Sequence, residues 1–350
     1  MLKYIFTYLS ICITTILLAQ PEEYYLVFQD IQSAQQTPKV VYHLNLSESN
    51  LKSVPDEVFK FTNLKILNIS ANDIHYLPDN LNQLSELHTL DISSNRYLHI
   101  ENVVEVLQKM PNLKHLIISK NNFTKMPIEL TTLTQLEILD LSYNQIQTLP
   151  AKIGLFKNLR VLKLHRNQIN DLPTEIEMLK KLRELELSYN EFEVLPLEVG
   201  NLDSLKILNM QENQLVKVPI TIGNLGELKT LNLNGNQLNE LPETISGLQN
   251  LEVLELAANQ FTALPEDIQY LKNLKKLNCF SNQFEDFPLI ICELKKLEEL
   301  NLASNQISTL SKRIKALYNL QLLNLYDNPI SDINRKKIAN CLPEHVKVRF

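Results

Sequence analysis

Hydrophobic residues recur along this chain in an order that one short segment illustrates. Residues 64–72 read LKILNISAN, with an apolar residue at the first, fourth and sixth places and asparagine at the ninth. Apolar residues two positions apart point to the same face of a strand, and the residues between them point to the other face. The same segment recurs through residue 328, so we expect one short strand in each copy.

Asparagine closes each copy at a nearly constant interval. The interval is 23 residues everywhere except between Asn95 and Asn121, where it is 26. Counting back 23 residues from Asn72 reaches Ser49, so the sequence predicts thirteen coils, the first of which carries serine. A side-chain amide can both donate to and accept from backbone groups left unpaired at a bend. Stacked coils would therefore place the asparagines in a ladder.

The second half of most copies reads LPxxIxxLxxL, and ten of the fifteen prolines, from Pro55 to Pro288, occupy this one position. Proline suits a return segment that needs no sheet hydrogen bond from its nitrogen. One copy cannot bury a core alone, so neighbouring copies must share one. We predict an α/β solenoid, with a parallel sheet on its concave face and short helical or 3-10 segments outside. The bulkier outer segments would curve the stack into a horseshoe.

The two ends of the chain depart from the repeat. Lys3, an uncharged apolar run over 5–18 and Ala19 predict a signal peptide over 1–19, shorter than the ~20 apolar residues of a permanent membrane span. Cys12 leaves a lipoprotein cleavage site open as an alternative. Residues 20–39 are expected to form an N-terminal helical cap, with a helix from Glu22 to Gln36, and the repeats to run over 40–330. A cap over 331–350 would hold a helix from Ile333 to Cys341 and an alternating final segment.

The 23-residue pattern LxxLxLxxNxLxxLPxxIxxL resembles the leucine-rich-repeat consensus over residues 40–330. The end segments, AQQTPKV at 34–40 and NPIS at 328–331 with Ile338, Leu342 and Pro343, are similar to those of secreted or surface leucine-rich-repeat proteins of Leptospira. The resemblance implies a bacterial protein, secreted or held at the outer surface or in the periplasm. It also implies a partner among host molecules and an association with virulence.

Composition narrows the possible functions. The formal net charge is −6 and no run of lysine and arginine is long enough for a phosphate-binding stripe, so we expect no nucleic-acid partner. The chain contains no GxSxG, HExxH, P-loop or CxxC motif, and we expect neither an enzyme nor a cofactor. His75 and His99 lie in adjacent coils, but two histidines without carboxylates are a weak metal signal, and we predict no metal. Cys279 is expected in the core.

The candidate ligand-binding residues lie six, four, two and one before each asparagine, on the strand face that should be exposed. In the middle coils these positions are rich in charged and aromatic residues, a composition typical of protein-binding hot spots. Ordinary solvated strand positions are the alternative interpretation. The candidates are Tyr143, Lys163, His165, Arg166, Glu184, Glu186, Tyr189, Glu212, Phe280 and Tyr326.

These observations predict a secreted or surface-exposed module that binds a host or extracellular protein through its concave face. An envelope-associated scaffold or a glycan-binding protein remains the alternative. The outer side offers no evident dimer surface, so a monomer is expected. The longer coil between Asn95 and Asn121 could form an outer α-helix over 101–110, either as tolerated bulk or as a second contact site.

Overall fold

The computed structural model describes residues 26–350, and the predicted signal peptide lies outside this range. The chain divides into two compact units, Met1–Leu116 and Ile117–Phe350. The described part of the first unit consists of β1 (Val27–Phe28), α2 (Ile31–Gln36), η2 (Pro38–Val40), β2 (His43–Asn45), η3 (Asp56–Lys60), β3 (Ile66–Asn68), η4 (Asp79–Gln83), β4 (Thr89–Asp91), α3 (Ile100–Leu107) and most of β5 (His115–Ile117).

The second unit alternates short strands with 3-10 helices. Its elements are η5 (Ile128–Thr132), β6 (Ile138–Asp140), η6 (Ala151–Leu155), β7 (Val161–Lys163), η7 (Thr174–Met178), β8 (Glu184–Glu186), η8 (Leu197–Asn201), β9 (Ile207–Asn209), η9 (Ile220–Asn224), β10 (Thr230–Asn232), η10 (Glu243–Gly247), β11 (Val253–Glu255), η11 (Glu266–Tyr270), β12 (Lys276–Asn278), η12 (Leu289–Glu293), β13 (Glu299–Asn301), η13 (Lys312–Ala316), β14 (Leu322–Asn324), α4 (Asp332–Cys341) and β15 (Lys347–Arg349). Strands β2 to β14 are the thirteen predicted strands.

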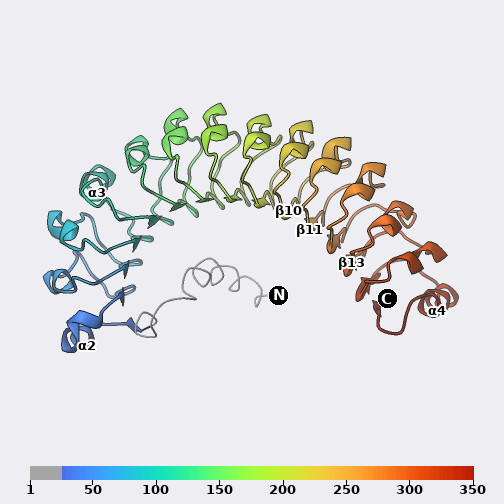
Figure 1. The fold of residues 1–350 in the computed structure, drawn as a ribbon, viewed down its shortest axis with the longest axis horizontal. Coiled ribbons are helices and arrows are strands. Elements are labelled where there is room, and N and C mark those ends of the chain that lie inside the picture. Colours follow the sequence, from blue (N-terminus) through green and yellow to red (C-terminus); the bar gives the residue numbers. More distant parts are fainter. Residues whose placement is uncertain (1–25) are drawn as a thin grey trace. The chain divides into compact units, whose positions relative to one another are not determined.

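The strands of the second unit pair in parallel and in chain order, with the central leucines in register. Leu231 pairs with Leu208 on one side and with Leu254 on the other. Within this unit the strands line the inner side of an arc and the 3-10 helices line its outer side (Figure 1). The predicted parallel sheet with outer 3-10 segments is therefore confirmed.

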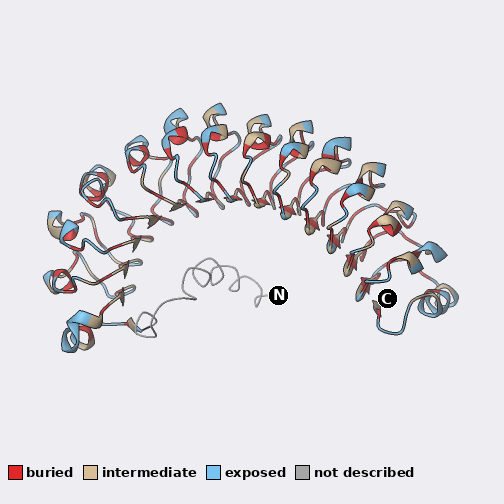
Figure 2. Cartoon of the chain, in the orientation of Figure 1, coloured by how far each residue is buried: buried red, intermediate tan, exposed pale blue. Residues whose placement is uncertain are grey.

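The core lies between the strands and the outer helices, where the buried residues gather (Figure 2). The central leucine of each strand from β6 to β14 is almost wholly inaccessible, and Phe156, Phe192, Phe261 and Phe284 fill the layer behind the strands. Cys279 is also buried there, as predicted, and burial raises the pKa of its thiol. Thiols in such surroundings are inert.

The predicted asparagine ladder is present, and each rung joins two coils. The Asn213 Nδ2 donates to the carbonyl of Met210 in its own coil and to that of Leu187 in the coil before, each at 3.0 Å. Its Oδ1 accepts from the backbone N–H of Phe192 in the coil before, at 3.2 Å. Proline precedes ten of the 3-10 helices in an extended conformation, for example Pro219 with φ −71° and ψ 155°. Proline thus sits where no backbone donor is needed.

The caps differ from expectation at the N-terminal end. Residues Val27–Phe28 form a strand that pairs with β2, whereas a helix was expected to include them. The helix begins after Asp30, whose carboxylate accepts from the backbone N–H of Ser33 at 2.7 Å, as an N-cap residue does. Pairing with β2 satisfies the backbone groups at that edge of the sheet, which outweighs the local helical pattern.

Helices are present near the C-terminus and in the long coil, where the sequence predicted them. Helix α4 spans Asp332–Cys341, and β15 covers the edge of β14. In the first unit, the extra residues of the 26-residue coil form α3, which buries its valines at 103, 104 and 106. No helix within residues 26–350 is long and apolar enough to cross a membrane.

Candidate functional site

Each coil of the second unit turns through a residue in the left-handed backbone region, directly before its ladder asparagine. Tyr143, Arg166, Tyr189 and Glu212 have φ values of 53°, 55°, 55° and 53°. This conformation costs a non-glycine residue about 1–2 kcal/mol. Glycine would avoid that cost, yet in this row of the second unit it occurs at Gly235 alone. We call these positions the turn row, and they present their side chains at the end of each strand.

Four consecutive members of the turn row form a ladder of alternating cations and aromatic rings. The Arg166 guanidinium carbon lies 4.1 Å from the centre of the Tyr189 ring and 5.4 Å from that of Tyr143. On the other side of Tyr143, the Lys120 Nζ lies 5.0 Å from the ring centre. Each such contact contributes about 0.5–1 kcal/mol at an exposed site. We call Lys120, Tyr143, Arg166 and Tyr189 the cation–tyrosine ladder.

The ladder is ordered and still accessible. The Tyr143 and Tyr189 residues retain 44% and 38% of their exposure. The His165 ring meets the Tyr143 ring edge-on, with centroids 5.1 Å apart, and therefore supports it from the strand side. The structure thus brings four of the predicted residues together, and it adds Lys120, which the sequence analysis missed. Lys120 could have been found from its position directly before Asn121, which is the position that Tyr143 and Arg166 occupy in the next two coils.

The charged candidates on the strands themselves are more buried than predicted. The Lys163 Nζ lies 3.9 Å from the Glu184 Oε1, and the two side chains are only 18% and 14% exposed. These two side chains are therefore much less accessible than their place on the solvent-facing side of the strands suggested. Neighbouring strands in a sheet lie ~4.8 Å apart, so long side chains on the inner face cover one another.

Glu186 lies beside this pair in the same strand as Glu184. Burial, followed by the nearby Glu184 carboxylate, raises the pKa of Glu186 to about 7. The Asn209 Nδ2 donates to its Oε2 at 2.8 Å and opposes that rise. Burial also lowers the pKa of His165. Glu186 therefore titrates near neutral pH.

A second hydrogen bond in the turn depends on which residue stands four places before the ladder asparagine. In eight coils, asparagine or aspartate four residues before the ladder asparagine accepts a hydrogen bond from the backbone N–H two residues later, as in an Asx turn, and Asn45 does the same four residues before Ser49. Lys163, Glu186 and Glu255 occupy that place without making this bond. These coils give up a local backbone hydrogen bond in exchange for a longer charged side chain on the inner face.

The remaining candidates do not join the cation–tyrosine ladder. Glu212 follows Tyr189 in the turn row and is exposed. Phe280 and Tyr326 are 40% and 63% exposed, but they lie four and six coils beyond Tyr189. A shallow hollow occupies the same late strands, and its lining includes Glu255, Lys276, Asn278, Glu299, Leu322 and Arg349.

Two family models match the repeats. A leucine-rich repeat model matches residues 39–97 and 111–169, and a leucine-rich repeat region model matches residues 153–233 and 220–349. Together they cover most of the chain. The chain belongs to the leucine-rich-repeat family. No curated protein sequence matches it.

Several solved structures are similar to this leucine-rich-repeat protein. A leucine-rich-repeat protein of Leptospira interrogans is 30% identical, with a TM-score of 0.65, over 93% of this chain and 100% of that one. An internalin of Listeria monocytogenes is 23% identical, with a TM-score of 0.73, over 95% of this chain and 98% of that one. The leucine-rich-repeat part of FLRT2, in a complex with latrophilin 3 and Unc5D, is 22% identical, with a TM-score of 0.61, over 86% of this chain and 87% of that one. The last two likenesses show the fold alone, and the first agrees with the predicted resemblance.

The two histidines considered for metal binding lie in adjacent coils of this leucine-rich-repeat protein, His99 in the longer coil and His75 in the coil before it. The His99 ring stacks on Tyr76 with centroids 4.3 Å apart, and the His75 ring lies 5.4 Å from that of Tyr97. The His75 Nε2 also lies 3.2 Å from the Asp73 Oδ1. Between residues 26 and 350, no group of three or more histidine, cysteine, aspartate or glutamate side chains could hold a metal ion. The rings instead form an exposed aromatic cluster.

Proposed function

We propose that this leucine-rich-repeat chain is a secreted or surface-exposed module that binds a protein, host or extracellular, through the inner side of its second unit. The observation that carries this proposal is the cation–tyrosine ladder. An Arg166 held between two exposed tyrosine rings presents its groups in one fixed arrangement. Tyrosine and arginine are the residue types that dominate binding energy at protein interfaces.

The ladder suits a protein partner because ordering it costs little on binding. Association normally requires about 0.5–1.5 kcal/mol for each flexible side chain that becomes fixed. Here the rings and cations already restrain one another, and the left-handed turn holds each Cα in place. The half-buried charges of Lys163 and Glu184 lie on the adjoining strands and would favour a partner whose surface charges are complementary to theirs.

The relatives support a binding role in general terms. The FLRT2 leucine-rich-repeat structure was solved in a complex with latrophilin 3 and Unc5D. That complex concerns FLRT2 itself, and it supports this chain only through the shared fold. The predicted signal peptide supports an extracellular place of action, and a bacterial partner of the organism's own remains an outcome of the test.

The test is binding of the purified protein to an array of extracellular proteins and glycans, with a double variant measured alongside. We expect Arg166→Glu with Tyr189→Ala to weaken a protein hit at least ~30-fold, since hot-spot residues contribute 2 kcal/mol or more. Circular dichroism should stay unchanged because both side chains are on the surface.

A matched control changes the same residue classes on the outer side. Tyr270 is 50% exposed in η11 and Lys272 is exposed just after it, so Tyr270→Ala with Lys272→Glu should leave the affinity unaltered. Equal affinity of all three proteins for the hit would remove the inner side as the binding site. Binding to glycans alone, or to nothing, would favour the envelope or scaffold alternative.

A further inference from the structure

A strip of basic residues lies along the edge of the second unit where strands β7 to β10 begin. The four segments are KNLR at 157–160, KKLR at 180–183, DSLK at 203–206 and GELK at 226–229. Together they hold seven cations and two carboxylates, although the whole chain has a net charge of −6. We call this surface the basic strip. Its cations are Lys157, Arg160, Lys180, Lys181, Arg183, Lys206 and Lys229.

Backbone hydrogen bonds hold the central row of the basic strip in line. The N–H of Arg183 donates to the carbonyl of Arg160, that of Lys206 to Arg183, and that of Lys229 to Lys206, each at 2.8 Å. Four cations therefore stand side by side, one per coil, about 4.8 Å apart at the backbone. Like charges placed directly opposite each other on neighbouring strands destabilise a sheet. The row is thus a local cost to the folded protein.

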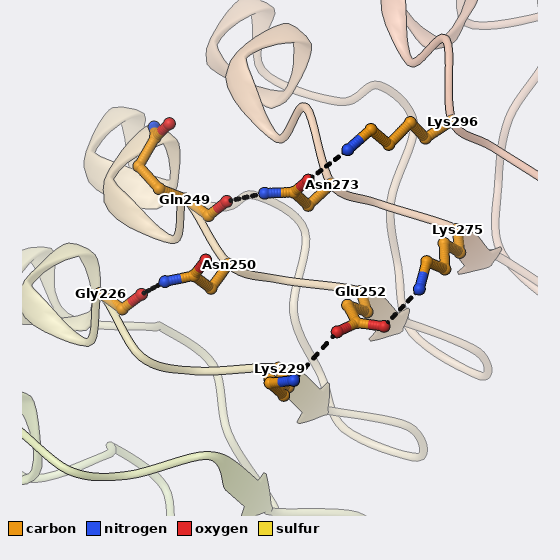
Figure 3. A network of polar contacts seen from close by, with 8 residues as sticks. All are labelled: Gly226, Lys229, Gln249, Asn250, Glu252, Asn273, Lys275 and Lys296. Carbon is orange, nitrogen blue, oxygen red and sulfur yellow. Dashed lines mark hydrogen bonds and ion pairs between the residues drawn. The ribbon is translucent and has the colours of Figure 1, made fainter.

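Carboxylates neutralise the two ends of this row. The Arg160 Nε lies 3.0 Å from the Glu137 Oε2 at one end. At the other end, Glu252 lies between Lys229 and Lys275, at 3.3 Å and 2.7 Å (Figure 3). Along the same edge, the Asn250 Nδ2 donates to the carbonyl of Gly226 and the Asn273 Nδ2 to that of Gln249, each in the preceding coil (Figure 3).

The centre of the row is not neutralised. Within the described residues, no carboxylate lies within ion-pair distance of Arg183 or Lys206. Arg183 is exposed and Lys206 is half-exposed. Nearby, Lys180 and Asp203 form an ion pair at 3.3 Å between two largely exposed side chains. Such pairs contribute little and exchange readily for another anion.

The other residues of the basic strip indicate which polyanion it suits. Its apolar members, Leu159, Leu182, Leu205 and Leu228, are fully buried, so no apolar anchor is available to a protein hot spot. The four segments contain no aromatic residue on which the bases of a single-stranded nucleic acid could stack. What remains is a line of ammonium and guanidinium groups, which recognises negative charge and, through arginine, planar or tetrahedral oxyanions.

We propose that the basic strip binds a linear sulfated polysaccharide, laid across the starts of β7 to β10. Its sulfate groups would take the place of the missing carboxylates beside Arg183 and Lys206. The neutralised ends limit the contact to four coils, about 14 Å at the strand spacing, so a short oligosaccharide suffices. This surface lies at the strand starts, whereas the cation–tyrosine ladder lies where the strands end, so the proposal is independent of the proposed protein-binding function.

The experiment measures binding of a size-defined heparin octasaccharide to the full protein by titration calorimetry at 50 and 200 mM NaCl. We expect Arg183→Ala with Lys206→Ala to weaken binding at least ~10-fold and to reduce the salt dependence, because two ionic contacts are lost. The charge-matched control is Lys336→Ala with Lys337→Ala, which removes two exposed cations from α4. It should change the affinity less than about twofold.

Two further probes separate the ligand classes. A polyglutamate peptide and a single-stranded DNA of equal charge should each bind more weakly than the octasaccharide. Tighter binding of either probe would overturn the assignment to a polysaccharide. An equal loss in the α4 control, or no octasaccharide binding at 50 mM NaCl, would overturn the basic strip as a site. Circular dichroism of both variants shows whether they are folded.

Discussion

Replacement of Glu186 by glutamine should remove a specific pH dependence from the stability of the protein. Burial raises the pKa of Glu186 from 4.5 to about 7, so the folded protein holds a proton there that the unfolded chain has released. Between pH 4.5 and about 7, unfolding therefore releases a proton, and the free energy of unfolding falls as the pH rises. Below this window the group is neutral in both states, and above it the loss is complete.

The size of the effect follows from the shift. A pKa change of one unit corresponds to 1.36 kcal/mol, so the full window amounts to about 3 kcal/mol. Glutamine cannot ionise, and its side-chain oxygen can still accept the hydrogen bond from the Asn209 Nδ2. Glu186→Gln should thus be more stable than the parent at pH 8 by about 3 kcal/mol, and the difference should vanish near pH 4.

The assay is urea unfolding at half-unit pH steps from 4 to 8, followed by circular dichroism. The quantity of interest is the difference in unfolding free energy between parent and variant, plotted against pH. Exposed Glu191 provides the control, and Glu191→Gln should give a flat difference. A flat line for Glu186→Gln as well would refute the reasoning, because it would mean that this carboxyl is ionised in the folded protein at neutral pH.

Two further predictions concern the repeat itself. Asn236→Ala should lower the unfolding free energy by at least ~2 kcal/mol, because the buried amide donates hydrogen bonds to three carbonyls and accepts one from a backbone N–H. As a control, Asn224→Ala changes an exposed asparagine and should leave the urea midpoint unchanged. Gly223→Ala should cost about 1–3 kcal/mol because its Cβ would lie 2.2 Å from the Thr244 carbonyl oxygen. Gly226→Ala meets nothing within 4 Å and should be tolerated, and equal thermal midpoints for the two variants would contradict this account.

The periodicity of the sequence was sufficient to predict the coils, because a 23-residue spacing determines which residues become neighbours. It placed Tyr143, Arg166 and Tyr189 in successive coils, and they are in contact. The predicted helix over Glu22–Gln36 was too long, because β-pairing of residues 27–28 depends on a partner strand that local pattern does not reveal.

The burial of the charged side chains at the site could not be predicted from the sequence. Whether Lys163 and Glu186 are solvated depends on how closely adjacent strands pack, and both proved largely covered. The basic strip was also missed, because a search for runs of lysine and arginine does not find cations that stand 23 residues apart. A repeat must be read across its copies as well as along the chain.

The left-handed turn row has an evolutionary consequence. Every non-glycine residue in that row carries much the same backbone cost, so exchanging one for another leaves the fold nearly as stable as before. The row already holds tyrosine, arginine, glutamate, alanine, serine and aspartate in the second unit. Point mutations there can change recognition without compensating changes in the core. A lineage under pressure to follow a changing partner could therefore vary this row first, one coil at a time.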